Sequence, residues 1–63
     1  MLRLIPKSDE EVTELRHLYH TTKDVRIRTR SQIILLAFDG LSAPKIARIV
    51  QLDPFSVRQY MKR

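Results

Sequence analysis

The chain has 63 residues, enough for one small domain, and its 43% hydrophobic and 30% charged residues suit a folded domain rather than a disordered one. Without cysteine it has neither disulfides nor thiolate metal sites, so packing must supply its stability. Its net charge of +5 favours an anionic partner. No apolar run approaches the roughly 18 residues that cross a bilayer, so we expect a soluble cytoplasmic protein.

The first predicted helix covers about residues 9–21. Ser8 and Glu11 have the spacing of a capping box, in which Ser8 accepts a hydrogen bond from the backbone N–H three residues on and Glu11 reaches back to Ser8. Apolar residues then recur at helical spacing. These residues are Val12, Leu15, Leu18 and Tyr19.

The second predicted helix covers about residues 24–39. It begins at Asp24, a favourable N-terminal cap, and ends before Gly40, which can adopt the left-handed conformation that terminates a helix. The alternation in residues 25–28 and the apolar run in residues 33–38 would each suit a strand as well. The length between the two terminating signals favours a helix. Because its second half is almost wholly apolar, we expect this helix to be central and buried.

Two shorter helices follow, at about residues 43–51 and 54–63. Ser42 is a favourable cap for the third helix, which has Pro44 in its first turn, and Asp53 followed by Pro54 has the same order for the fourth. Apolar residues at helical spacing predict one inward face on each helix. These are Ile46, Ala47, Ile49 and Val50 in the third helix and Val57, Tyr60 and Met61 in the fourth.

The last two helices fit a helix-turn-helix. Two short helices that cross steeply need a small residue where their backbones approach, which Ala47 provides, and apolar residues beside the turn, which Leu52 and Val57 provide. We therefore predict an all-α fold, a small bundle of about four helices with a C-terminal helix-turn-helix of the homeodomain-like or paired-like kind. Its fourth helix would offer an outer face to the major groove of DNA.

The positive charge is concentrated where this motif lies. Residues 1–24 contain four basic and five acidic residues, whereas residues 25–63 contain eight basic and two acidic residues. Such an asymmetry is typical of a nucleic-acid-binding surface, and a merely solubilising surface is the alternative interpretation.

Residues 28–63 resemble the N-terminal DNA-binding segment of transposases of the IS630/Tc1/mariner superfamily. That segment has an arginine-rich helix with an apolar end, a break of glycine, apolar residue and serine, a helix with an isoleucine-alanine pair, and a recognition helix with basic residues at its end. The matching stretches are residues 30–42 (RSQIILLAFDGLS), residues 45–48 (KIAR) and residues 56–63 (SVRQYMKR).

The resemblance implies a bacterial, nucleoid-associated protein segment that recognises transposon-end DNA. The catalytic domain of that family, with its metal-binding acidic triad, is expected in a separate region beyond Arg63. Two positions depart from the family's pattern. Gln51 stands where the turn usually has a glycine, which leaves the tightness of the turn open. Phe55 stands where a small polar residue is common.

The residues expected to contact bases lie at the start and on the outer face of the fourth helix. Arginine can bond bidentately to guanine and glutamine to adenine, so Arg58 and Gln59 are the principal candidates. Ser56 either contacts DNA or caps the helix. Phe55 either touches a thymine methyl group or, in the interpretation that we favour, packs against the first helix or over the turn.

A second set of residues is expected to contact phosphates, which position a domain without reading sequence. Ser42 and the free N–H groups of the third helix suit a phosphate. Because Arg26, Arg28 and Arg30 are spaced two residues apart, they cannot all share one helical face. We expect at least one of them to form a structural pair, for instance with Asp24. The full predicted set is Ser42, Lys45, Arg48, Lys62, Arg63, Arg28 and Arg30.

Two other functions stay open. The chain could be a helix-turn-helix regulator or antitoxin-like homodimer, or it could be a helical protein-interaction module. The dimer face would be Leu2, Leu4, Ile5 and Leu18, and the interaction module would use Phe55, Tyr60 and Met61.

Catalysis, metal binding and cofactor binding are not expected of this chain. His17 and His20 are spaced three apart on the first helix, but two ligands are too few for a structural zinc site. The acidic residues 9–11 suit helix capping, and neither a nucleophile–base arrangement nor a phosphate-binding glycine loop is recognisable. The expected partner is therefore double-stranded DNA, without a membrane.

Overall fold

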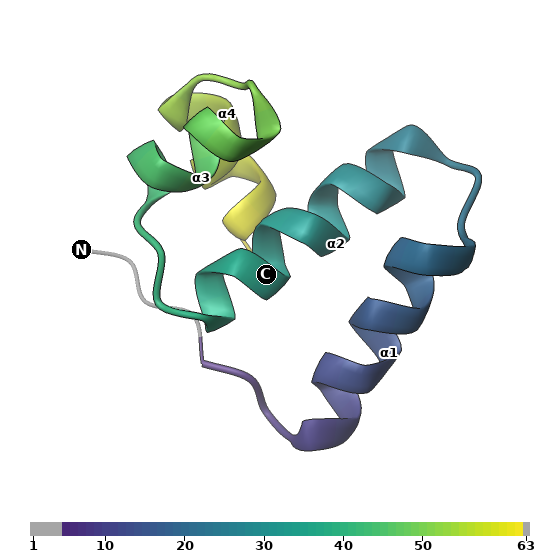
Figure 1. The fold of residues 1–63 in the computed structure, drawn as a ribbon. Coiled ribbons are helices and arrows are strands. Elements are labelled where there is room, and N and C mark those ends of the chain that lie inside the picture. The colour runs from purple at the N-terminus through teal and green to yellow at the C-terminus, as the bar shows by residue number, and fades with distance from the viewer. Residues whose placement is uncertain (1–4, 63) are drawn as a thin grey trace.

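The computed structural model describes residues 5–62, which form four helices (Figure 1). They are α1 (Asp9–Thr21), α2 (Val25–Phe38), α3 (Ala43–Val50) and α4 (Pro54–Met61). The prediction of an all-α fold with about four helices is confirmed, since the described part of the chain contains no strand. Within the same part, even the longest helix, α2 with 14 residues, lacks the length and apolar character of a membrane span.

The start of α1 follows the predicted capping box. Ser8 has an extended backbone, and its hydroxyl accepts a hydrogen bond of 3.2 Å from the backbone N–H of Glu11. The Glu11 carboxylate accepts a 2.8 Å hydrogen bond from the backbone N–H of Lys7. The expected donor is the N–H of Ser8, one residue later. The first bond satisfies one of the N–H groups that a helix start leaves without an intrahelical partner.

The start of α2 is capped by Asp24, as the sequence predicts. The Asp24 carboxylate accepts hydrogen bonds from the backbone N–H groups of Arg26 (2.9 Å) and Ile27 (3.4 Å). The cap itself lies outside the helix, so α2 begins at Val25, one residue after the predicted start.

The end of α2 is a Schellman motif around Gly40, which has a φ of +92°. The Gly40 N–H donates to the Ala37 carbonyl (3.0 Å), and the Leu41 N–H donates to the Leu36 carbonyl (3.3 Å). A left-handed glycine therefore ends this helix, as predicted, and turns the chain toward α3.

Three residues connect α3 to α4, and the first of them, Gln51, is left-handed (φ 60°, ψ 42°). The next N–H, from Leu52, donates to the Ala47 carbonyl (3.0 Å) and closes the end of α3. The tight turn thus forms without the glycine that the resemblance would place there, at a cost of about 1–2 kcal/mol for a side chain in this conformation. α3 accordingly ends at Val50, one residue before the predicted end.

α4 is shorter than predicted. It begins at Pro54 behind the expected cap Asp53, but it ends at Met61 because Lys62 already has an extended backbone (φ −68°, ψ 133°). The predicted end, Arg63, lies outside the described residues.

The core lies where α2, α3 and α4 meet, and each of these helices contacts the other two (Figure 1). Ile33, Ile46 and Val57, one residue from each helix, are fully buried. The other members of the cluster are Ala37, Ala47 and Met61. The buried second half of α2 and the small Ala47 between α3 and α4 agree with the sequence prediction.

Two apolar residues near the turn are not buried. Ile49 of α3 is 51% exposed, so the prediction that it faces the interior is wrong, and Leu52, predicted as an apolar residue that holds the turn, is 38% exposed. The face of α3 that meets the other helices carries the buried Ile46 and Ala47 and the half-buried Val50. Ile49 falls beside that face, where no helix covers it.

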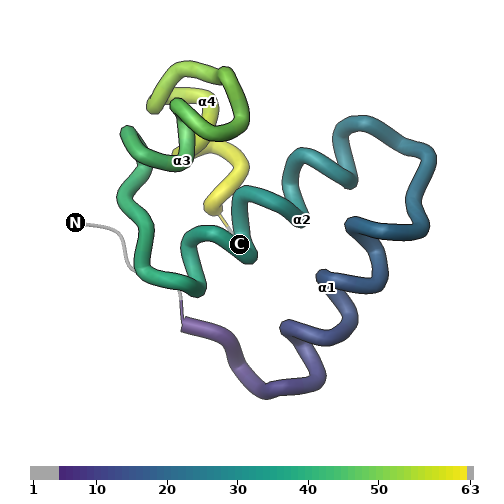
Figure 2. The backbone as a smooth tube through the Cα atoms, in the orientation of Figure 1, coloured from purple at the N-terminus to yellow at the C-terminus, as the bar shows by residue number. Residues whose placement is uncertain are grey.

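α1 lies on the other side of α2 from α3 and α4, and among the described helices it contacts α2 alone (Figure 2). None of its residues is fully buried. Two buried residues of α2, Ser31 and Ile34, line a pocket together with residues of α1. The domain is therefore a three-helix core, α2 to α4, with α1 added to the outer side of α2.

Candidate nucleic-acid interface

The outer face of α4 presents one continuous row of exposed side chains. Phe55, Arg58 and Gln59 are exposed, and their spacing of three and four residues from Phe55 puts them on one helical face. Lys62, which is also exposed, follows directly after the last residue of α4. The buried Val57 fixes the opposite face against α2 and α3. We call these four residues the α4 stripe. Packing of α4 therefore leaves three of the four predicted base-contacting residues side by side at the surface.

Ser56, the fourth predicted base-contacting residue, is half-buried and is engaged locally. Its backbone N–H donates a 3.1 Å hydrogen bond to the Asp53 carboxylate. Hydrogen bonds from the Ser56 hydroxyl and then from this N–H lower the pKa of Asp53, since both stabilise the charged carboxylate. Of the two roles predicted for Ser56, the geometry favours helix capping.

Phe55 is 65% exposed, so the favoured interpretation that it packs against the first helix or over the turn is wrong. α4 contacts α2 and α3 but not α1, so the first helix does not cover this ring. An exposed phenylalanine at the start of the α4 stripe keeps the other predicted role, contact with a thymine methyl group.

α3 carries the predicted phosphate-contacting residues Lys45 and Arg48, which are exposed and one helical turn apart. Ser42 occupies the N-cap position of α3, but its side chain makes no capping hydrogen bond. Its hydroxyl is therefore not committed to the helix start in the way that Ser8 is at α1. A phosphate contact at Ser42 requires such an uncommitted hydroxyl. Arg63, another predicted phosphate contact, lies outside the described residues.

The three arginines at the start of α2 have different surroundings. Arg28, a predicted phosphate contact, donates a 2.9 Å hydrogen bond from its Nη2 to the backbone carbonyl of Thr22, the residue that caps the end of α1. The expected structural pair is thus present, although the acceptor is this carbonyl rather than the expected Asp24 side chain.

Arg26 and Arg30 instead line a hollow of about 390 Å³ between α2 and α4. Gln59 and Lys62 of the α4 stripe line the same hollow, together with Tyr60 and Ile27. The sequence prediction omitted Arg26. The signal that could have identified it is its spacing of four residues from Arg30, which places the two on one helical face.

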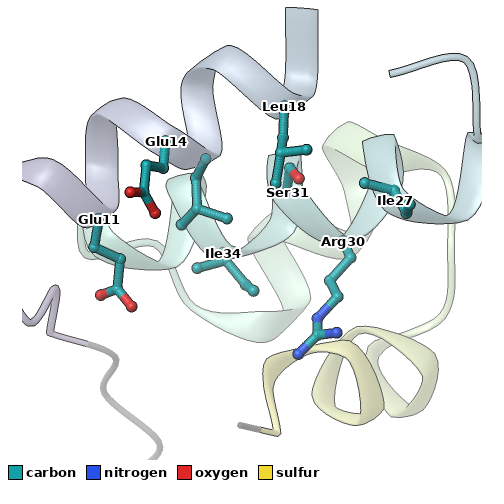
Figure 3. A pocket seen from close by; sticks show the side chains of 8 residues that line it. Glu11, Glu14, Leu18, Ile27, Arg30, Ser31 and Ile34 are labelled. Atoms are coloured by element: carbon teal, nitrogen blue, oxygen red, sulfur yellow. The ribbon is translucent and has the colours of Figure 1, made fainter. Parts of the chain in front are cut away.

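A second hollow, of about 420 Å³, lies between α1 and α2 and is lined mainly by apolar side chains and two carboxylates. Figure 3 shows Glu11 and Glu14 on its α1 side. Arg30 also lines this hollow, and its side chain extends from α2 toward α4 (Figure 3). Leu18, a predicted member of a dimer face, lies at this hollow and is 43% exposed. Ile5 of that predicted face is 74% exposed, and Leu2 and Leu4 lie outside the described residues.

The charged residues are divided between the two sides of α2. The first turn of α1 is acidic, and α1 contacts neither α3 nor α4. The exposed cations of α3 and of the α4 stripe are on the other side (Figure 1). Within the described residues no three histidine or carboxylate side chains gather as metal ligands, and His20 packs edge-on against the ring of Tyr19 (5.2 Å between centroids).

No family model, curated protein or solved structure matches this chain.

Proposed function

We propose that this chain binds double-stranded DNA as a helix-turn-helix domain, with α4 as the recognition helix in the major groove. The observation that carries the proposal is the α4 stripe. Phe55, Arg58 and Gln59 are exposed along one face of a helix whose other face is fixed in the core, and the exposed Lys62 follows directly after that helix. The major groove of B-DNA admits one α-helix, and arginine and glutamine have donor patterns that match guanine and adenine edges.

The packing of the last three helices supports this proposal. A helix-turn-helix needs two short helices joined by a tight turn and held by a third helix. Here the three-residue connection, the left-handed Gln51 and the buried Ala47 hold α3 against α4, and α2 packs on both. The exposed Lys45 and Arg48 of α3 suit phosphate contacts beside the groove.

Charge distribution also supports a polyanion as the partner. The acidic α1 and the basic α3 and α4 lie on different sides of α2, so the protein has a positive side that would orient it toward DNA as the two approach. Recognition of transposon ends by a transposase segment is the specific form of this proposal. It rests on the matching stretches of residues 30–42, 45–48 and 56–63.

The direct test is fluorescence anisotropy of the 63-residue chain with a labelled random-sequence duplex, titrated with salt. We expect a linear log–log decrease in affinity whose slope corresponds to roughly 4–7 neutralised phosphates. After selection of a preferred site, Arg58→Ala and Gln59→Ala should each cost about 1–3 kcal/mol against that site. Arg16→Ala, which removes an exposed cation of α1, is the control and should have little effect. An absence of binding at low salt would overturn the proposal.

A second candidate function is a helical protein-interaction module. Of the residues predicted for it, Phe55 is exposed, whereas Tyr60 is half-buried and Met61 is buried in the core. Such a surface would therefore use the exposed Ile49 and Leu52 beside Phe55. A contiguous exposed apolar patch commonly marks a binding surface. This alternative predicts weak DNA binding without sequence preference. Arg58→Ala and Gln59→Ala would then lower affinity equally for all duplexes, as loss of general contacts does.

A further inference from the structure

We propose that the hollow between α2 and α4 is a phosphate-binding site, which takes one phosphodiester of the DNA strand that borders α4. The inference rests on the proposed DNA-binding function and adds a defined site to it, with Arg26, Arg30 and Lys62 as its cationic ligands. The hollow measures about 390 Å³ and is built on two helices that pack against each other.

The geometry brings together cations that are distant in the sequence. Arg26 and Arg30 are one helical turn apart on α2, and Lys62 follows the last residue of α4. All three line the same hollow, and no acidic side chain of the described residues shares that lining. Figure 3 shows Arg30 extending from α2 toward α4.

No carboxylate of the described residues lines this hollow to neutralise its charges. Among the described residues, Arg28 is the arginine of α2 whose side chain forms a hydrogen bond. It donates to the Thr22 carbonyl, and neither residue lines the hollow. No hydrogen bond or ion pair within the described residues engages the side chains of Arg26, Arg30 or Lys62. Three like charges around one hollow repel one another, and an anion between them would relieve that repulsion.

A phosphodiester fits the donors that are present. Its two free oxygens can accept paired hydrogen bonds from a guanidinium, and a lysine adds a point charge. Gln59 lines the hollow as well, and its amide supplies a neutral donor.

The position of the hollow points to DNA as the source of the phosphate. Gln59 and Lys62 belong both to the α4 stripe and to the lining of the hollow, so the two surfaces are continuous. When the α4 stripe faces the base edges, the hollow lies beside it, where the backbone of a bordering strand passes. This contact would position α4 in the groove without reading sequence.

The test compares the salt dependence of DNA binding for the wild-type chain and for Arg26→Gln/Arg30→Gln, measured by fluorescence anisotropy on one duplex. Glutamine has a helix propensity similar to that of arginine, and the side chains of Arg26 and Arg30 are exposed. Circular dichroism should therefore show an unchanged fold. We expect the slope of log affinity against log salt to become shallower by about one unit. The loss of affinity between 50 and 200 mM salt would then be about three- to fourfold smaller than for the wild type.

The matched control is Lys7→Gln/Arg16→Gln, which removes the same charge from exposed positions on the α1 side. Its slope should stay close to that of the wild type. If both double variants change the slope equally, the effect is one of net charge and the phosphate site is overturned, while DNA binding by the chain still stands. If the wild-type chain fails to bind at 50 mM salt, the proposed function itself is overturned, so the two failures are distinguishable.

Discussion

The guanidinium of Arg28 lies 2.9 Å from the backbone carbonyl of Thr22 and donates a hydrogen bond to it, which ties the first turn of α2 to the end of α1. The last carbonyl groups of a helix lack intrahelical partners and carry the negative end of its dipole, so a cation is well placed there. α1 has no fully buried residue and touches α2 alone. This hydrogen bond therefore adds a specific polar contact to the packing of α1 on α2.

We expect Arg28→Gln to lower the free energy of unfolding by about 0.5–1 kcal/mol, because an exposed hydrogen bond from a charged donor is lost. Urea denaturation followed by circular dichroism measures this change. The same variant should leave the salt slope of DNA binding near the wild-type value. A slope reduced by a full unit with unchanged stability would instead return Arg28 to the phosphate contacts predicted from sequence.

Gln51→Gly should stabilise the domain by about 1 kcal/mol, because glycine adopts the left-handed conformation of this turn without a steric penalty. Thermal unfolding should show a higher midpoint for this variant. Gln51→Ala is the control, since alanine keeps a Cβ atom and relieves no backbone strain. Equal midpoints for the two variants would contradict the left-handed conformation.

The stability of the domain should depend on the ionisation of Asp53. Hydrogen bonds from Ser56 hold the pKa of Asp53 below that of an unfolded aspartate, so the charged form is favoured in the folded state. This contribution is fully present above the unfolded value of about 3.9 and is lost as the pH falls through the lower folded value.

Asp53→Asn retains a capping oxygen but does not titrate, so its thermal midpoint should fall less than that of the wild type between about pH 4 and pH 2. Thermal unfolding across this pH range, followed by circular dichroism, compares the two proteins. Parallel curves for both would show that Asp53 makes no such contribution.

Val57→Ala and Phe55→Ala should separate folding from binding within one helix. Val57 is fully buried, so its truncation should cost about 2 kcal/mol through lost burial and a residual cavity. Phe55 is 65% exposed, so its truncation should change stability by less than about 0.5 kcal/mol while weakening binding to a selected DNA site. Denaturant titration together with anisotropy distinguishes them, and a strongly destabilised Phe55→Ala would restore the packing interpretation.

The two serine caps offer a matched pair of substitutions. Ser8→Ala removes a capping hydrogen bond and should cost about 1 kcal/mol, whereas Ser42→Ala removes none and should cost only a few tenths. Ser42→Ala should weaken DNA binding if its hydroxyl meets a phosphate. Comparable losses of stability for both variants, in the same denaturant titration, would mean that Ser42 also caps its helix.

The starts of three helices and the end of α2 could be predicted to within one residue from the sequence because the signals that set them are local. Ser8, Asp24 and Asp53 each bond to an N–H group two or three residues along the chain, and Gly40 ends α2 by its own backbone freedom. These interactions exist within one turn of helix, so no knowledge of the tertiary structure is needed to identify them. The concentration of basic residues after residue 24 is likewise a property of the sequence.

The surroundings of the individual side chains were decided only by the packing of the helices. The exposure of Phe55 and Ile49, the bond of Arg28 to Thr22 and the hollow that Arg26 shares with Lys62 depend on how each helix is rotated against its neighbours. A periodic pattern identifies the apolar face of a helix but leaves open which residues at its edge another helix will cover. That rotation is set by how Ile33, Ile46 and Val57 fit together in the core, and these residues are far apart in the chain.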